Sequence, residues 1–237
     1  MDRSPADSFQ PADTADAAVF ERLLAARHSC RGFRSEPVPR ATIERILAAA
    51  QRTASWCNAQ PWQVLVASGA AAQRFSAAML AEAGAPDATP DFEWPAAYQG
   101  VYQQRRRECG FALYESVGVA RGDREASARQ GLENFRLFGA PHVALITTDR
   151  SLGVYGAIDC GAYVSNFLLA ATSLGIATIP QAALAARPQV ARDLFDLPPD
   201  RLFVCGISFG YADATHPANG FRTSRASLEE TVSWVDD

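Results

Sequence analysis

Residues 27–33 read RHSCRGF, and residues 55–62 read SWCNAQPW. The first run places two guanidinium groups, an imidazole and a hydroxyl within five positions, and such donors neutralise and orient a phosphate group. The second run offers an amide, aromatic rings and a Pro-Trp turn, which suit a flat polar ring. Arg27 and Arg31 alone are weak evidence, because arginines at this spacing usually form a solvated face. Together the two runs predict a site for a ligand with a phosphate at one end and a planar ring at the other.

The composite R-H-S-x-R-x-F-x-x-x-P-V-P, followed by N-x-Q-P-W, resembles the nitroreductase family. The resemblance runs from about residue 20 to about residue 225, and includes GIATIPQ at 175–181 and SFGY at 208–211. It implies an α+β fold of three layers, in which helices surround a central mixed β-sheet. It also implies a homodimer in which the C-terminal segments are exchanged.

The resemblance further implies a flavin mononucleotide (FMN) site at the dimer interface, built from three groups of residues. The phosphate and ribityl end would be held by Arg27, His28, Ser29 and Arg31, with Arg225 or Arg222 as the C-terminal basic partner. The neighbouring subunit would contribute Ser55, Trp56 and Asn58. The isoalloxazine ring would be lined by Pro180, Gln181 and Ala182, with a backbone amide near its N5.

The implied activity is that of an enzyme: hydride is taken from NADH or NADPH, and a nitroaromatic, a quinone or a similar electron-poor acceptor is reduced in a ping-pong cycle. No G-x-G-x-x-G is present, so no separate dinucleotide domain is indicated and the donor would use the acceptor's pocket. The cofactor carries the electrons, so no catalytic side chain is assigned. Two alternatives stay open: reductive dehalogenation or enone reduction on the same fold, and a non-enzymatic flavin-binding or sensing module.

A separate hypothesis concerns residues 98–107, YQGVYQQRRR. In the family this region covers the substrate side of the flavin. Tyr98 and Tyr102 at a spacing of four would share a helix face, and Arg105 follows. Such a face could hold an aromatic acid, with its ring against tyrosine and its carboxylate on arginine. An exposed arginine-rich helix is the simpler interpretation and is favoured.

Composition excludes several other classes of function. The chain has 237 residues and a net charge of -4, which disfavours nucleic-acid binding and attachment to an anionic membrane. It contains no lysine, so Schiff-base chemistry is excluded. Five cysteines without a C-x-x-C, and no secretory leader, indicate reduced thiols in a cytoplasmic protein. Three histidines without metal-ligand spacing predict no metal site.

Along the chain we expect a flexible tail at 1–16 and one domain at 17–237. Helices are expected at 15–26, after Pro39, and at 69–83, 97–117, 125–138, 156–174 and from Pro188 to before Pro198. Strands are expected at 62–68, 143–148, 176–179 (ending at Pro180) and 203–211, with an exposed loop or lid at 84–95. The helix at 156–174 is apolar nearly all round and interrupted by Asp159. It reads as a core helix that could also meet a partner subunit.

Trp56 could narrow a ligand pocket or pack in the core, and Cys57 reads as a small packing residue.

Overall fold

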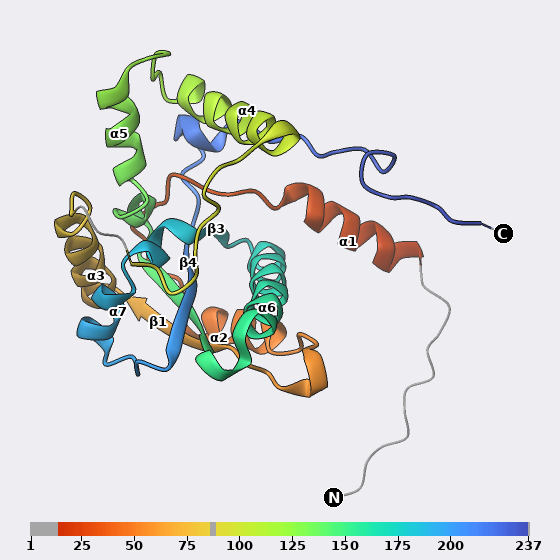
Figure 1. Cartoon of the computed structure of the whole chain (residues 1–237), viewed down its shortest axis with the longest axis horizontal. Helices are drawn as coiled ribbons and strands as arrows, with labels where there is room; N and C mark the ends of the chain where they lie inside the picture. The colour runs from red at the N-terminus through yellow and green to blue at the C-terminus, as the bar shows by residue number, and fades with distance from the viewer. Residues whose placement is uncertain (1–13, 86–88, 237) are drawn as a thin grey trace, which may run out of the picture.

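The structure, a computed structural model, describes residues 14–85 and 89–236 (Figure 1). Its helices are α1 (Thr14–Ala26), α2 (Arg40–Ala50), α3 (Ala70–Ala81), α4 (Gly100–Ser116), α5 (Arg124–Leu132), α6 (Gly153–Ser173) and α7 (Pro188–Phe195). Its strands are β1 (Gln63–Ser68), β2 (His142–Asp149), β3 (Ala177–Gln181) and β4 (Arg201–Gly210). The expected helices and strands are therefore all present, with shifted ends.

The strands form one sheet in the order β1-β2-β4-β3. Each neighbouring pair runs antiparallel, with Leu65 opposite Leu145 and Ala144 opposite Ile207. We expected a mixed sheet. Within the described residues the parallel component is a single isolated bridge between Ser29 and Thr178. That bridge attaches the segment after α1 to the β3 edge of the sheet.

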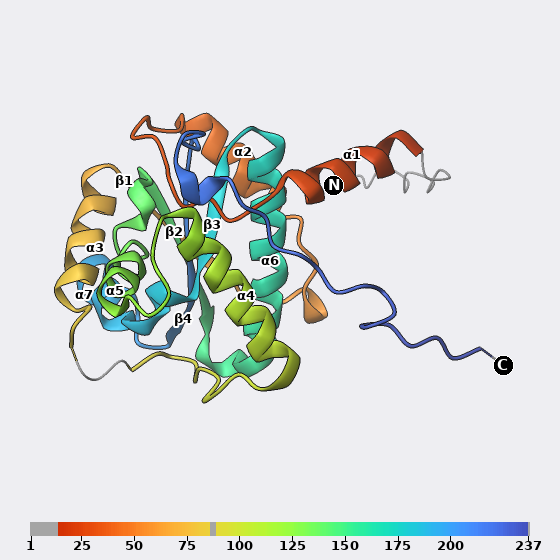
Figure 2. The ribbon, with the colours of Figure 1, turned by 90° about the horizontal axis from the view of Figure 1, so that it is seen from above.

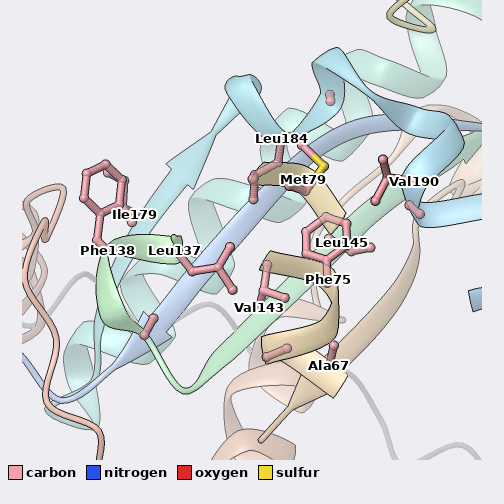
Figure 3. Packing of buried hydrophobic residues seen from close by; sticks show 14 of the residues in the cluster. Ala67, Phe75, Met79, Leu137, Phe138, Val143, Leu145, Ile179, Leu184 and Val190 are labelled. Carbon is pink, nitrogen blue, oxygen red and sulfur yellow. The ribbon is translucent and has the colours of Figure 1, made fainter. Parts of the chain in front are cut away.

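Alternate side chains of the strands pack against helices on opposite faces of the sheet. Val143 and Leu145 of β2 belong to one core cluster, with Phe75 of α3 and Val190 of α7 (Figure 3). The alternate residues Ala144 and Ile146 belong to a second cluster, formed with residues of α2 and α6. The sheet thus lies between two helical layers, as the three-layer expectation requires. Because both faces are buried, β2 reads as a continuous apolar run rather than an alternating one.

A β-bulge in the pairing of β2 with β4 changes the face of one large side chain. Ile146 pairs with Cys205, but the next residue, Thr147, pairs with Phe203. The extra residue, Val204, reverses the alternation. Phe203 therefore lies in the cluster with α3 and α7, whereas Ile207 lies in the cluster with α6.

Helix α6 is the central helix on the face of the sheet that α2 also covers. By length and apolar composition it would pass as a membrane span. Its residues Cys160, Tyr163 and Phe167 are buried, and it packs against α2, β2 and β3. Burial raises the pKa of the Cys160 thiol to about 11 and that of Tyr163 to about 12. These groups are packing residues, neutral at physiological pH.

Three details differ from the expectations. Strand β3 continues through Pro180 to Gln181, because β3 lies at the sheet edge, where a proline without an N–H is tolerated. Helix α5 ends at Leu132, before a tight turn in which Leu137 and Phe138 have positive φ. The chain is already helical at Thr14, inside the tail expected at 1–16, whose first thirteen residues lie outside the described part.

The loop between α3 and α4 is tied to the body through Asp91. The Arg192 guanidinium donates to both Asp91 carboxylate oxygens, at 2.8 and 2.9 Å, and the Phe203 N–H donates to one of them at 2.8 Å. Both side chains of the ion pair are largely buried. The expected exposed loop is therefore anchored at one point to α7 and β4; its residues 86–88 lie outside the described part.

Helix α1 and the C-terminal segment project from the same side of the molecule (Figures 1 and 2). Both carry exposed apolar side chains: Val19, Phe20 and Leu24 on α1, and Leu228, Trp234 and Val235 near the C-terminus. Within residues 211–236 the one helical element is the short 3-10 turn Pro217–Asn219, and none of these residues belongs to a strand of the sheet. Such projecting apolar surface is typical of a protein–protein interface.

Candidate functional site

The segment after α1 is held in extended form between two parts of the sheet. The Cys30 N–H donates to the Thr178 carbonyl oxygen at 3.0 Å, and the Arg34 N–H to the Tyr211 carbonyl oxygen at 2.9 Å. Phe33 also forms an isolated bridge with Ala212. These contacts fix the backbone of residues 29–34, so the side chains of this segment start from rigid positions.

Asn219 fastens the same segment from the C-terminal side. Its Oδ1 accepts the Arg31 N–H at 2.7 Å, and its Nδ2 donates to the Gly32 and Asp213 carbonyl oxygens at 2.9 and 2.8 Å. A Cβ on Gly32 would lie 2.3 Å from the His216 ring, so glycine is needed for this close approach. The sequence signals singled out neither Asn219 nor the role of Gly32.

Five predicted residues from the two ends of the chain line one cavity of about 320 Å³: Arg27, His28, Ser29, Arg31 and, from the C-terminal segment, Arg225. Arg222, the alternative basic partner, lines it as well. We call this the arginine cavity. Its lining contains no aspartate or glutamate, and within residues 14–85 and 89–236 none of the four arginines forms an ion pair.

The electrostatics of the arginine cavity favour an anion. Burial, and secondarily the like charge of Arg225, lowers the pKa of Arg27 from its usual value. Burial also lowers the pKa of Arg31. Since arginine stays protonated at neutral pH, the cavity holds several uncompensated positive charges. A phosphate monoester, with close to two negative charges and three acceptor oxygens, matches this donor set.

The side chains of Arg222, Arg225 and His28 are each held by a hydrogen bond to a residue two or three positions away. The Arg222 guanidinium donates to the Asn219 carbonyl oxygen at 2.8 Å, and that of Arg225 to Thr223 Oγ1 at 2.9 Å. The His28 ring donates from Nδ1 to the Ala26 carbonyl oxygen at 3.0 Å, which leaves Nε2 free for other contacts. Three further lining residues, Cys109, Phe221 and Thr223, had no sequence signal that pointed to the site.

A larger cavity of about 930 Å³ adjoins the arginine cavity between α4 and the C-terminal segment. The two cavities share Cys109, Arg222, Thr223 and Arg225 in their linings. A ligand could therefore place a phosphate in one cavity and extend toward the other.

Of the residues predicted to line a flavin ring, Gln181 cannot offer its side chain to a ligand, because that side chain is bonded inside the protein. The Gln181 side chain is buried: its Nε2 donates to the Asn134 carbonyl oxygen at 2.8 Å, and its Oε1 accepts from the Ser208 hydroxyl at 2.5 Å. Only backbone atoms of Gln181 are left for a ligand. Pro180 is half-buried and Ala182 is exposed.

Ser55, Trp56 and Asn58 lie in a tight turn against α6, and none of them lines the arginine cavity. The Trp56 ring is 63% exposed and packs on Tyr155, with ring centroids 4.7 Å apart. The Trp56 N–H approaches both oxygens of the Asp159 carboxylate, at 3.2 and 3.4 Å. Within one protomer, then, residues 27–31 and residues 55–58 form separate surfaces.

The aromatic-acid hypothesis is corrected in one respect. Tyr98 precedes α4, whose N-cap is Gln99, so Tyr98 and Tyr102 do not share a helix face. The Arg106 guanidinium lies over the Tyr98 ring, 5.4 Å from its centroid. Arg105 alone of the three predicted residues lines the larger cavity, where its guanidinium is 3.6 Å from the Glu230 carboxylate. The tyrosine pair is therefore not a clamp in this arrangement.

Comparisons with known proteins give consistent results. Residues 24–211 match the model of a family described as "Nitroreductase family". The chain is 38% identical over 221 residues to nitroreductase NfnB of Mycolicibacterium smegmatis, with 93% of each chain covered. It is 30% identical over 226 residues to a 4-nitrobenzoate reductase of Nocardioides sp., with 92% of each covered. The crystal structure of the FMN-dependent NfnB from Mycobacterium smegmatis in complex with NADPH superposes with a TM-score of 0.89 at 37% identity. That superposition covers 94% of this chain and 100% of the other.

Proposed function

This chain belongs to the nitroreductase family, and from that membership we propose that it is an FMN-dependent enzyme that takes hydride from NADH or NADPH and reduces nitroaromatic or related electron-poor acceptors. The relatives point to NADPH as the donor, since NfnB was crystallised with it, and to nitroarenes as acceptors. The chemistry is supplied by FMN, which when bound accepts hydride from the nicotinamide and passes electrons to the acceptor.

The observation that carries the proposal is the arginine cavity. Four guanidinium groups from opposite ends of the chain converge on about 320 Å³ of space whose lining has no carboxylate. Without an anion, such a set of like charges is unfavourable. The phosphate of FMN supplies that anion, and Arg27, Arg31 and Arg225 would hold it, with the Ser29 hydroxyl as a further donor.

The other predicted residues have complementary roles in the proposal. His28 and Arg222 would contact the ribityl end of FMN. The backbone of Pro180, Gln181 and Ala182 would bound the ring. Ser55, Trp56 and Asn58 would contact the ring from a second subunit, and their separation from the arginine cavity within one protomer supports that arrangement. Arg105 would bind an anionic group of an acceptor or donor in the larger cavity.

A homodimer follows from this division of the site between protomers. The apolar side chains exposed on α1, α6 and the C-terminal segment provide the surface it needs. We also place the protein in the cytoplasm and treat residues 17–237 as one domain. Reduced thiols are consistent with that compartment, and α6 serves as a core helix.

The test is spectroscopic. The purified protein should be yellow and release FMN on denaturation. Under anaerobic conditions NADPH should bleach the flavin band, and 4-nitrobenzoate should restore it. A protein that takes up no FMN would contradict the proposal. A protein that binds FMN but is not bleached by NADPH or NADH would be the binding or sensing module instead.

A further inference from the structure

The turn that contains Trp56 has an unfavourable backbone. Cys57, Asn58 and Gln60 have φ values of 51°, 55° and 47°, in the left-handed region that favours glycine. Left-handed non-glycine residues persist where the surroundings hold them in place, and they cluster at ligand sites. Contacts outside the turn must therefore stabilise this conformation.

Two residues of α6 provide such contacts. Asp159 accepts the Trp56 N–H, and Tyr155 packs on the Trp56 ring, as described above. They are four residues apart and so lie on the same side of the helix. Inside the turn, the Ser55 hydroxyl accepts the Gln60 N–H at 2.9 Å, which closes the loop but does not fix it to the body. Asp159 is also the one charged residue of α6, whose apolar pattern is otherwise interrupted by Ser165 and Asn166.

The contacts hold two aromatic rings in an exposed position. Trp56 is 63% exposed and Tyr155 is 55% exposed. A small cavity of about 190 Å³ lies beside them, lined in part by Ala59, Leu152 and Gly156. The two rings are tilted by 57° to each other, so the pair presents two apolar ring surfaces at an angle. Rigidly held rings offer such surface at little cost in side-chain entropy, and a planar ring packs well against it.

We propose that Asp159 is a positioning residue for the acceptor pocket: it holds the Ser55–Gln60 turn so that Trp56 and Tyr155 form an aromatic wall against which the ring of an aromatic acceptor lies. This inference rests on the proposed function, in which the turn faces the flavin of the neighbouring subunit. Asp159 acts through its hydrogen bond to the turn. Its side chain also lines the small cavity, so a variant that keeps the hydrogen bond but removes the charge is needed to separate the two effects.

The test uses FMN-loaded Asp159→Ala and Asp159→Asn. Asparagine keeps an oxygen that can accept the Trp56 N–H, whereas alanine does not. The first readout is the Kd of benzoate, an unreactive aromatic acid, measured by calorimetry. The second is KM for 4-nitrobenzoate against KM for ferricyanide, an acceptor without a ring. Asp200→Ala is the matched control, because within the described residues the Asp200 side chain makes no hydrogen bond or ion pair.

We expect Asp159→Ala to raise the benzoate Kd and the 4-nitrobenzoate KM about tenfold, the upper range for loss of aromatic packing, with a clearly smaller change for ferricyanide. Asp159→Asn should recover most of the loss. Tyr155→Leu should resemble Asp159→Ala, and Tyr155→Phe should resemble the wild type. Equal losses for both acceptors, no recovery by asparagine, or an unchanged benzoate Kd would overturn the inference. If the wild type fails to oxidise NADPH, the proposed function fails, and the benzoate Kd still tests the wall.

Discussion

At the scale of single residues, the proposed function gives Arg27 a direct contact with the phosphate of FMN. Its guanidinium lines the arginine cavity near Arg225 and has no carboxylate partner there. Arg27→Ala should weaken FMN binding by about 1.5–3 kcal/mol, the loss of a hydrogen bond between charged groups. Fluorescence titration of the apoprotein with FMN measures it. Arg22→Ala, at an exposed position of α1 shortly before Arg27, is the control; equal effects of the two changes would contradict the assignment.

His142 should make the folded state sensitive to acid. Its Nε2 accepts the Val38 N–H at 2.8 Å, and its Nδ1 lies 2.7 Å from the Ser68 hydroxyl, so the ring is neutral. Burial lowers its pKa from 6.5 in the folded state. As pH falls below about 6.5 the unfolded chain binds a proton that the folded chain excludes, so stability decreases by up to about 1.4 kcal/mol per pH unit. Urea unfolding at pH 7.5 and 5.5 should show this loss reduced in His142→Gln; the same pH slope in both proteins would contradict it.

The sequence predicted the four arginines of the arginine cavity because the motif around Arg27 and Arg31 is local and its basic partners lie in a short C-terminal run. It did not predict Asn219, whose bonds to Arg31 and Gly32 join residues 188 and 187 positions apart. It also did not show that the Gln181 side chain is used inside the core. Such contacts depend on tertiary packing, which a single sequence does not display.

At the scale of elements, the long apolar segments were predicted best. Strand β2 and helix α6 are long apolar runs, and both predictions are confirmed within a few residues. The ends were less accurate: Pro180 does not stop β3, because sheet order decides whether a proline is tolerated. Tyr98 falls outside α4 because the helix begins at Gly100, three residues later than the expected start at residue 97.

The ion pair of Asp91 with Arg192 is a contact between elements that the sequence did not indicate. It joins the loop before α4 to α7 and, through the Phe203 N–H, to β4. Arg192→Ala should lower the free energy of unfolding by about 3 kcal/mol, because it leaves a largely buried carboxylate without its counter-ion. Arg40→Ala removes the exposed pair with Glu44, and should cost about 0.5 kcal/mol or less. Chemical denaturation compares the two; equal losses would show that the buried pair is not a structural anchor.

At the scale of the whole molecule, the exposed apolar side chains of the projecting helix α1 predict a dimer. Val19, Phe20 and Leu24 are 46%, 53% and 46% exposed, which is unfavourable for a free monomer surface. Sedimentation equilibrium should give twice the chain mass of 25.5 kDa. Phe20→Asp should shift the protein toward the monomer. It should also weaken FMN binding, because the flavin ring would lose its contacts with the second subunit. A monomeric wild type that binds FMN fully would contradict the shared site.

The proposed function requires that the arginine cavity binds the phosphate of FMN. Calorimetric titration of the apoprotein with FMN and with riboflavin, which lacks the phosphate, tests this directly. FMN should bind at least about 100-fold more tightly than riboflavin, because riboflavin cannot form the charge-assisted hydrogen bonds of the phosphate. Equal affinity for the two flavins would contradict it.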